Sequence, residues 1–362
     1  MDNYNGCWYL NHSPLGSTKT NALRPQFIDF LKSMKRCLAT LCLLVFISPS
    51  LWAKDPLASW KSGPIKTDIL AFVAETEKKG GANFVPVPER IAVFDNDGTL
   101  WAEQPLYVPN LFVFDRIRSI APQHPEWAEV PTYSQVFEGR VESLRKLSSK
   151  AFNAIYIDSQ KGVNHERYEQ DVLEFLKRER HPRFNKPYTD LVYQPMLELM
   201  TYLREHGFKT YIVTGGPRDF IRPWSETIYG VPREQVIGTH LDTVYEVSDQ
   251  GPRIVSGSNF KHSNVEKGKV IGIFEHIGRR PIFAVGNSDG DYEMLDWTTS
   301  QSRKTLALYI HHDDADREWA YDKDSEVGLL KRGLEDAPNK GWRVVSMKQD
   351  WIHIFPFEIH GP

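Results

Sequence analysis

Short apolar runs alternate along the chain with segments whose apolar residues recur at helical spacing. Arg90–Phe94 is a continuous apolar run with β-branched residues, and it stops at a polar Asp-Asn-Asp-Gly turn. A run of this kind predicts a buried strand. The same pattern predicts three further strands, at Phe208–Val213, Pro281–Val285 and Thr305–Ile310.

Helical periodicity fills the intervals between these strands. Apolar residues recur at helical spacing from Tyr193 to Leu203 and from Val270 to Ile277, and glycines (Gly207 and Gly278) stand where helices commonly end. Strands that alternate with helices predict an α/β fold with a doubly wound, Rossmann-like parallel sheet. The first three predicted strands end in polar turns, and ligands of such sheets gather at the carboxyl ends of the strands. We therefore expect these turns to meet in one functional site.

The first two predicted strands are separated by about a hundred residues, far more than one crossover needs. Helical patterns fill this interval, around Leu111–Ile120, Tyr133–Leu147 and His165–Arg178. We therefore expect an inserted helical cap domain at residues 105–187. Residues 54–104 and 188–362 are expected to form the core domain.

The N-terminal segment has the pattern of an export signal. Basic residues after Met34 precede the apolar run Cys37–Ile47, and the small residue Ala53 stands at a plausible cleavage point. The run is too short to span a bilayer comfortably, which favours a signal peptide over an anchor. We expect residues 34–53 to be a signal peptide and residues 1–33 to be an N-terminal extension or a start-site artefact. The mature protein would then be periplasmic or secreted, without stable membrane association after signal removal.

Composition and charge argue against three features: disulfide bonds, thiol catalysis and nucleic-acid binding. The three cysteines all lie within this N-terminal segment, so the predicted mature chain has neither disulfides nor thiol catalysis. A formal net charge of −3 gives no excess of Lys and Arg to neutralise a phosphate backbone. We therefore expect no nucleic-acid partner.

Asp95 and Asp97 follow the first predicted strand and carry the main chemical signal. Phosphoryl transfer needs a nucleophile, a cation and a proton donor for the leaving group. Two carboxylates at i and i+2 can divide these tasks, with the first as nucleophile and metal ligand and the second as acid. The backbone carbonyl of the second can also bind the cation. An ordinary Asp-Gly turn is the structural alternative, and the buried strand before it favours the catalytic interpretation.

With Thr99, these residues form an Asp-x-Asp-x-Thr motif, and the chain resembles the haloacid dehalogenase superfamily over residues 88–312. The resemblance is to phosphoserine-phosphatase-like members with a C1-type cap. It implies a Mg²⁺-dependent phosphohydrolase that removes phosphate from a small phosphomonoester through an aspartyl-phosphate intermediate. Asp95 would be the nucleophile, Asp97 the acid and base, and both would bind the metal. True dehalogenases lack the second Asp, because displacing halide from carbon needs no leaving-group acid.

The second and third family motifs supply groups for the substrate phosphate. Thr214 ends the next predicted core strand and is followed by Gly215, which together imply a phosphate site of a hydroxyl and backbone N–H groups at a helix start. The third motif is a lysine that neutralises the nucleophile and the phosphate. Lys267 fits this catalytic and phosphate-binding position, and two neighbouring lysines compete for it, Lys261 and Lys269.

The fourth motif, Gly286 to Asp291, departs from the family pattern. Asn287 takes the usual position of the first acidic metal ligand, and Asp291 takes the second. Asn can bind Mg²⁺ through its amide oxygen but supplies no charge, so Asp289 is an alternative ligand. Glu103 lies within one residue of the cap-loop Glu of phosphoserine-phosphatase-like members, which implies that it binds substrate.

Other polar and aromatic residues have simpler interpretations. Trp101 and Tyr107 suit core or hinge packing, and His311–Asp314 suits a strand end with a solvated turn, because adjacent strand residues face opposite ways. The same phosphoenzyme could serve a phosphotransferase or phosphomutase. Asn287 alone leaves open a non-catalytic binding protein on the same scaffold.

Overall fold

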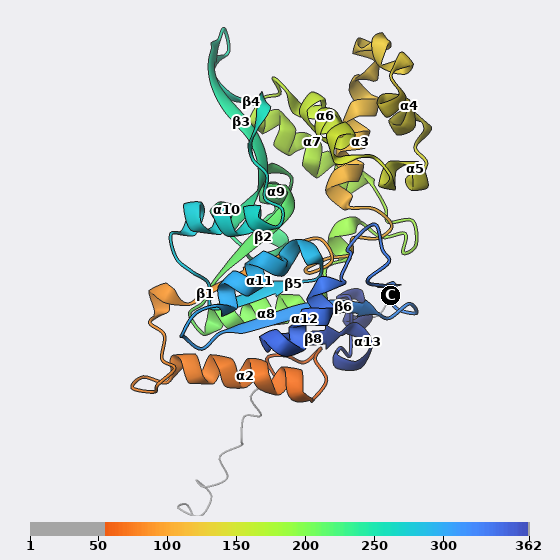
Figure 1. Ribbon diagram of the computed structural model, residues 1–362. Helices are drawn as coiled ribbons and strands as arrows, with labels where there is room; N and C mark the ends of the chain where they lie inside the picture. The colour runs from red at the N-terminus through yellow and green to blue at the C-terminus, as the bar shows by residue number, and fades with distance from the viewer. Residues whose placement is uncertain (1–54, 361–362) are drawn as a thin grey trace, which may run out of the picture. The chain divides into compact units, whose positions relative to one another are not determined.

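A mainly parallel eight-stranded sheet forms the centre of the fold (Figure 1). The computed structural model describes residues 55–360. The strand order is β4-β3-β2-β1-β5-β6-β7, and β8 pairs with β6. The strands are β1 (Ile91–Phe94), β2 (Lys209–Pro217), β3 (Val236–Ser248), β4 (Gly251–His262), β5 (Phe283–Gly286), β6 (Leu306–Asp313), β7 (Ala320–Tyr321) and β8 (Arg343–Ser346).

The doubly wound α/β fold expected from the sequence is confirmed. β1 pairs in parallel with β2 on one side and with β5 on the other, and all four predicted strands lie in the sheet. Side chains of β1 alternate between two buried faces: Ala92 and Phe94 join one apolar core, and Ile91 and Val93 join another. Because both faces are covered, the strand is apolar along its whole length.

Helices cover both faces of the sheet. The first core includes side chains of α2 (Pro64–Glu77), α8 (Gln194–Glu205) and α9 (Arg218–Tyr229). The second includes side chains of α10 (Lys267–Ile277), α11 (Tyr292–Thr299) and α12 (Arg332–Lys340). The short helices α13 (Met347–Asp350) and α14 (Phe357–His360) end the described chain.

Five helices lie between β1 and α8; the first four share a separate apolar cluster that includes Phe114 and Ile155, and the fifth joins the first core through Tyr168 and Val172. They are α3 (Val108–Ile120), α4 (Pro131–Glu138), α5 (Val141–Arg145), α6 (Ser149–Gln160) and α7 (His165–Arg178). The helix expected over Tyr133–Leu147 is broken at Gly139, whose φ of 69° is left-handed. Helix α7 has the predicted bounds, and its first turn is capped by the Asn164 side chain.

The long β3–β4 hairpin was not predicted from the sequence. It extends beside the inserted helices (Figure 1). Leu241 of β3 and Phe260 of β4 join the apolar cluster of these helices, and the Phe260 ring stacks on Tyr156 at 5.5 Å between ring centroids. The inserted helices therefore pack against a part of the core that follows them in the chain by about a hundred residues.

Some predictions stay untested. The extension, the signal peptide and its cleavage point lie outside the described residues, and the boundaries of the cap domain remain a prediction. No helix among residues 55–360 is long and apolar enough to cross a bilayer.

Candidate active site

Asp95 and Asp97 lie at the carboxyl end of β1, between β2 and β5. The Asp95 backbone N–H donates to the Val285 carbonyl at 2.9 Å, which continues the β1–β5 ladder to the edge of the site. Both carboxylates are buried. The turn after them needs Gly98, because its φ is 72° and an added Cβ would lie 2.0 Å from the Asn287 side-chain nitrogen.

Lys269, and not Lys267, is the lysine of the site. The Lys269 ammonium lies 2.5 Å from Asp95 Oδ1 and 2.6 Å from Asp291 Oδ1, and it is almost fully buried. Lys267 is exposed at the first turn of α10. Two residues correspond to about 200° of helix rotation, so these lysines leave α10 in nearly opposite directions. The prediction of Lys267 is therefore corrected to Lys269, and Lys261 is an exposed residue of β4.

The fourth motif brings Asn287 and Asp291 into the site and turns Asp289 away. The second oxygen of Asp291 accepts the backbone N–H groups of Asn287 and Ser288, at 3.0 and 3.1 Å. The Asp289 carboxylate accepts three backbone N–H groups at the start of α12, from Lys331, Arg332 and Gly333. Asp289 therefore caps a helix and is not placed as a substitute metal ligand.

Asn287 and Glu103 form a hydrogen-bonded pair at the site. The Asn287 side-chain N–H donates to Glu103 Oε1 at 2.7 Å, and the Tyr321 hydroxyl donates to the same oxygen at 2.7 Å. Asn287 Oδ1 accepts a hydrogen bond from the Thr99 hydroxyl at 3.2 Å. Glu103 was expected to bind substrate; its carboxyl group is buried beside Gly98, and its role in substrate binding stays a prediction.

Thr214 and Gly215 lie in the last residues of β2, before α9 begins at Arg218. The Thr214 side chain is buried, and its hydroxyl accepts the Gly216 backbone N–H at 3.0 Å. A Cβ added to Gly216 would lie 3.7 Å from Asp97 Oδ2, so this segment passes close to the Asp97 carboxylate. The helix start expected directly after Thr214 is delayed, because the glycines continue the strand.

Burial sets the ionisation of the carboxylates. It raises the pKa of Asp97 to about 6, against the opposing effect of the Trp101 indole N–H, which donates to Asp97 Oδ1 at 2.9 Å. Burial and then the charge of Asp291 raise the pKa of Asp95, while Lys269 opposes them. Burial also raises the pKa of Glu103 well above its ordinary value. The pKa of Asp95 is raised to about 7 and that of Asp97 to about 6, so both carboxyl groups can exchange a proton near neutral pH, and the Lys269 ammonium favours the ionised form of Asp95.

Residues 92–296, more than half of the chain, match the haloacid dehalogenase-like hydrolase family. This segment runs from β1 to α11 and contains Asp95, Thr214, Lys269 and Asp291. The chain belongs to the haloacid dehalogenase-like hydrolase family. The resemblance to the haloacid dehalogenase superfamily is thereby confirmed, and the C1 type of the cap stays a prediction.

Several solved structures are similar to this hydrolase. One is a conserved protein of unknown function from Anaerococcus prevotii DSM 20548, with 17% identity, a TM-score of 0.49, and coverage of 78% of this chain and 91% of that one. Another is a phosphoserine phosphohydrolase-like protein from Francisella tularensis, with 16% identity, a TM-score of 0.35, and coverage of 69% and 98%. A third is a probable phosphoserine phosphatase from Vibrio cholerae, with 15% identity, a TM-score of 0.36, and coverage of 69% and 63%. No curated protein matches the chain.

Sequence reasoning missed two groups that support the site of this haloacid dehalogenase-like hydrolase. His312 was assigned to a solvated turn, but it is buried, and its Nε2 lies 2.8 Å from the Gly98 carbonyl, while its Nδ1 lies 3.0 Å from Glu318. The Asn264 side-chain N–H donates to the Thr214 carbonyl at 2.8 Å. Neither residue belongs to a family motif quoted above, so only the folded chain reveals them.

Proposed function

We propose that this hydrolase is a phosphatase that removes phosphate from a small phosphomonoester through an aspartyl-phosphate formed on Asp95. The observation that carries the proposal is the pair of buried carboxyl groups at the end of β1. Asp95 lies beside the Lys269 ammonium, and Asp97 has a raised pKa. Ester hydrolysis needs both a nucleophile and a proton carrier, whereas displacement of halide from carbon needs only the first.

In the first step, an Asp95 oxygen attacks phosphorus and forms a new P–O bond while the bond to the leaving oxygen breaks. The leaving oxygen takes a proton from Asp97, so it departs as an alcohol. In the second step, Asp97 takes a proton from water, and the water oxygen attacks the same phosphorus. Asp95 leaves with its electron pair, and inorganic phosphate is released. Lys269 stabilises the negative charge of both transition states, because its ammonium is already fixed between carboxylates.

We also propose a Mg²⁺ ion, and the residues of the site fit it. The carboxylates of Asp95, Asp97, Asp291 and Glu103 are all buried, and within residues 55–360 Lys269 is the one cation paired with any of them. A buried excess of negative charge is costly unless a cation compensates it. The site therefore has an electrostatic need for a cation.

The ligands for this ion would be oxygen atoms, as Mg²⁺ prefers: the Asp95 carboxylate, the Asp97 backbone carbonyl and the Asn287 amide oxygen. No group of three His, Cys, Asp or Glu side chains in residues 55–360 is placed to hold a metal. The proposed ligands include only one acidic side chain, that of Asp95, and the other two ligands are a backbone carbonyl and a side-chain amide oxygen. When bound, the ion would neutralise charge on the phosphoryl oxygens.

We infer that helices α3 to α7 act as the cap that selects the substrate. Pro109, in the first turn of α3, lies 3.3 Å from the position of a Cβ on Gly216, beside the Asp97 carboxylate. Asp95 and Asp97 are both buried, so a substrate reaches them only when part of this cover moves. A closed site of this kind favours a small phosphorylated molecule.

The export of the protein is a separate proposal. It rests on the basic, apolar and small-residue pattern of residues 34–53. N-terminal sequencing of the protein recovered from the periplasm or the medium of an expressing bacterium would test it. A start near Lys54 is expected, and an intact N-terminus on cytoplasmic protein would contradict the proposal.

The phosphatase proposal is tested by p-nitrophenyl phosphate hydrolysis with Mg²⁺ and with EDTA. Wild-type protein should hydrolyse the ester only with the metal, and Asp95→Asn should abolish turnover. Asp289→Asn is the matched control, because the same change at a helix cap leaves the reacting groups in place. Turnover that survives Asp95→Asn would disprove the mechanism. Phosphate transfer to added alcohols instead of water would identify a phosphotransferase.

A further inference from the structure

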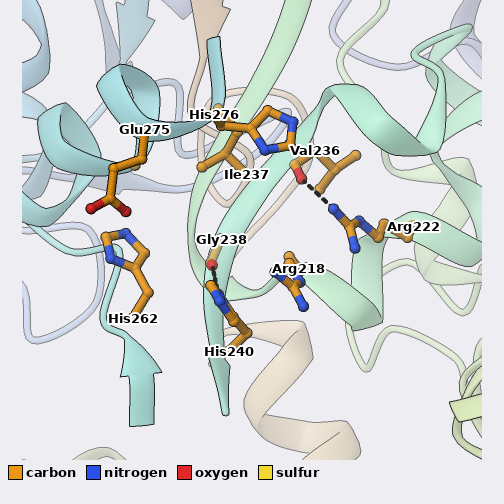
Figure 2. A pocket seen from close by; sticks show the side chains of 10 residues that line it. Arg218, Arg222, Val236, Ile237, Gly238, His240, His262, Glu275 and His276 are labelled. Carbon is orange, nitrogen blue, oxygen red and sulfur yellow. Dashed lines mark hydrogen bonds between the residues drawn. The ribbon is translucent and has the colours of Figure 1, made fainter. Parts of the chain in front are cut away.

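A polar cavity lies apart from the Asp95 site. It has a volume of about 210 Å³ and is lined by residues of α9, β3, β4 and α10 (Figure 2). None of Asp95, Asp97, Thr214 and Lys269 lines it. Its ionisable lining residues are Arg218, Arg222, His240, His262, Glu275 and His276.

Arg218 presents unused hydrogen-bond donors to this cavity. Its Nε donates to Asp219 Oδ1 at 3.2 Å, and no other hydrogen bond of its guanidinium occurs among residues 55–360. Figure 2 shows the Arg218 guanidinium between Arg222 and His240. The two terminal nitrogens of an arginine form a planar fork that suits two oxygens of one anion.

Arg222 adds a second positive charge in a fixed position. Its Nε donates to the Arg233 carbonyl at 3.1 Å, and one terminal nitrogen donates to the Val236 carbonyl at 3.4 Å (Figure 2). Arg218 and Arg222 share a single acidic partner, Asp219. Burial and the nearby charge of Arg218 lower the pKa of Arg222, so an anion placed here would relieve an unfavourable accumulation of positive charge.

Histidines complete the lining. His240 Nδ1 lies 3.1 Å from the Gly238 carbonyl (Figure 2) and His276 Nε2 lies 2.6 Å from the Glu234 carbonyl. A neutral imidazole must donate to a carbonyl through the nitrogen that faces it, so the hydrogen bonds fix the orientation of both rings. Glu275 is the one acidic side chain in the lining, and it is exposed.

We propose that this cavity is a binding site for a small tetrahedral oxyanion of the phosphate class, with Arg218 as the main ligand and Arg222 as electrostatic support. The volume limits the ligand, because pockets that enclose drug-sized molecules are typically about 300–1,000 Å³. The site is distinct from the Asp95 centre and does not depend on the proposed phosphatase activity.

The test is isothermal titration calorimetry, in which inorganic phosphate is titrated into the full chain with EDTA present and with the ionic strength held constant by NaCl. Arg218→Gln should weaken phosphate binding by about tenfold or more. Glu275→Gln should strengthen it severalfold, because this exposed change removes the competing carboxylate. Arg253→Gln is the control, since Arg253 pairs with Glu246 on the β3–β4 hairpin and does not line the cavity.

Two results would overturn the proposal. One is the absence of phosphate binding with a Kd below about 10 mM in the wild-type protein. The other is binding that is unchanged by both Arg218→Gln and Glu275→Gln but lost in Lys269→Gln, which would place the phosphate at the Asp95 site. Because Glu275 is exposed and its replacement does not threaten folding, the proposal stays testable even if Arg218→Gln does not fold.

Discussion

The Asn287 side-chain amide donates to the Glu103 carboxylate at 2.7 Å. Asn287 stands where the family pattern has an acidic metal ligand, and Glu103 places a carboxylate directly against it. The carboxyl group missing at one position is therefore present on the neighbouring side chain. Burial raises the pKa of Glu103, and a bound cation would favour its ionised form.

The Asn287–Glu103 pair predicts non-additive effects on Mg²⁺ binding. Asn287→Asp alone puts two carboxyl groups in contact and should lower the free energy of unfolding. Glu103→Gln alone removes a carboxyl group that a bound cation would ionise, and it should weaken Mg²⁺ binding. The double variant restores one carboxylate and one amide. We expect it to recover both properties, with a favourable coupling of about 1 kcal/mol or more. Calorimetric Mg²⁺ titration and urea unfolding of all four proteins would measure this, and purely additive changes would refute it.

Replacement by Gln is predicted to lower kcat strongly at Lys269 and to change it little at Lys267. Lys269→Gln removes the one ammonium that contacts Asp95, so kcat for p-nitrophenyl phosphate should fall by about 10²–10³. Lys267→Gln changes an exposed residue and should alter kcat by less than about twofold. Circular dichroism would establish that both variants fold. A larger loss at Lys267 than at Lys269 would contradict the assignment.

Trp101 is predicted to position the Asp97 carboxyl group. Trp101→Phe keeps an aromatic ring but removes the N–H donor to Asp97, and kcat should fall by about tenfold or more with little change in KM. Trp224→Phe is a matched control, because it removes an indole N–H that donates to the Phe220 carbonyl instead. It should lower stability while kcat stays within about twofold of wild type. Equal losses of kcat in both variants would show that the effect is one of packing.

His181 predicts a loss of stability in mild acid. Burial lowers the pKa of His181, whose Nε2 lies 2.8 Å from the Gln104 carbonyl and whose Nδ1 accepts the Arg183 backbone N–H. Since the folded pKa lies below the unfolded value of about 6.5, the unfolded chain binds more protons as pH falls through that value. The contribution of this neutral histidine is full above pH ~6.5 and is lost as pH decreases towards the folded pKa.

The urea midpoint measured at about pH 7.5 and about pH 5.5 would check the His181 prediction. His181→Gln should show a smaller decrease between the two pH values than wild type does. His124→Gln is the control, because the His124 side chain is 41% exposed, and its replacement should change the decrease less than His181→Gln does. An identical decrease in all three proteins would exclude His181 as the source.

The positions of four strands (β1, β2, β5 and β6) and of the polar turns after β1, β2 and β5 could be predicted from the sequence. β1 is apolar at every position because both faces of the sheet are covered, and its end is marked by Asp95. The helix at His165–Arg178 was also predicted, since its periodicity is local. These features depend on neighbours within a few residues, so a linear pattern records them.

The partners of the polar side chains were decided only by the tertiary structure. The choice of Lys269 over Lys267 depends on which side of α10 faces the sheet. Asp289 is turned away by backbone N–H groups more than 40 residues further along the chain, and His312 supports the turn at Gly98 across 214 residues. Such contacts join segments that are distant in sequence, and the pattern around either residue carries no sign of the other. The sequence alone determines where the strands end and which chemical groups stand there, and the packing of the sheet and its helices decides which of those groups meet.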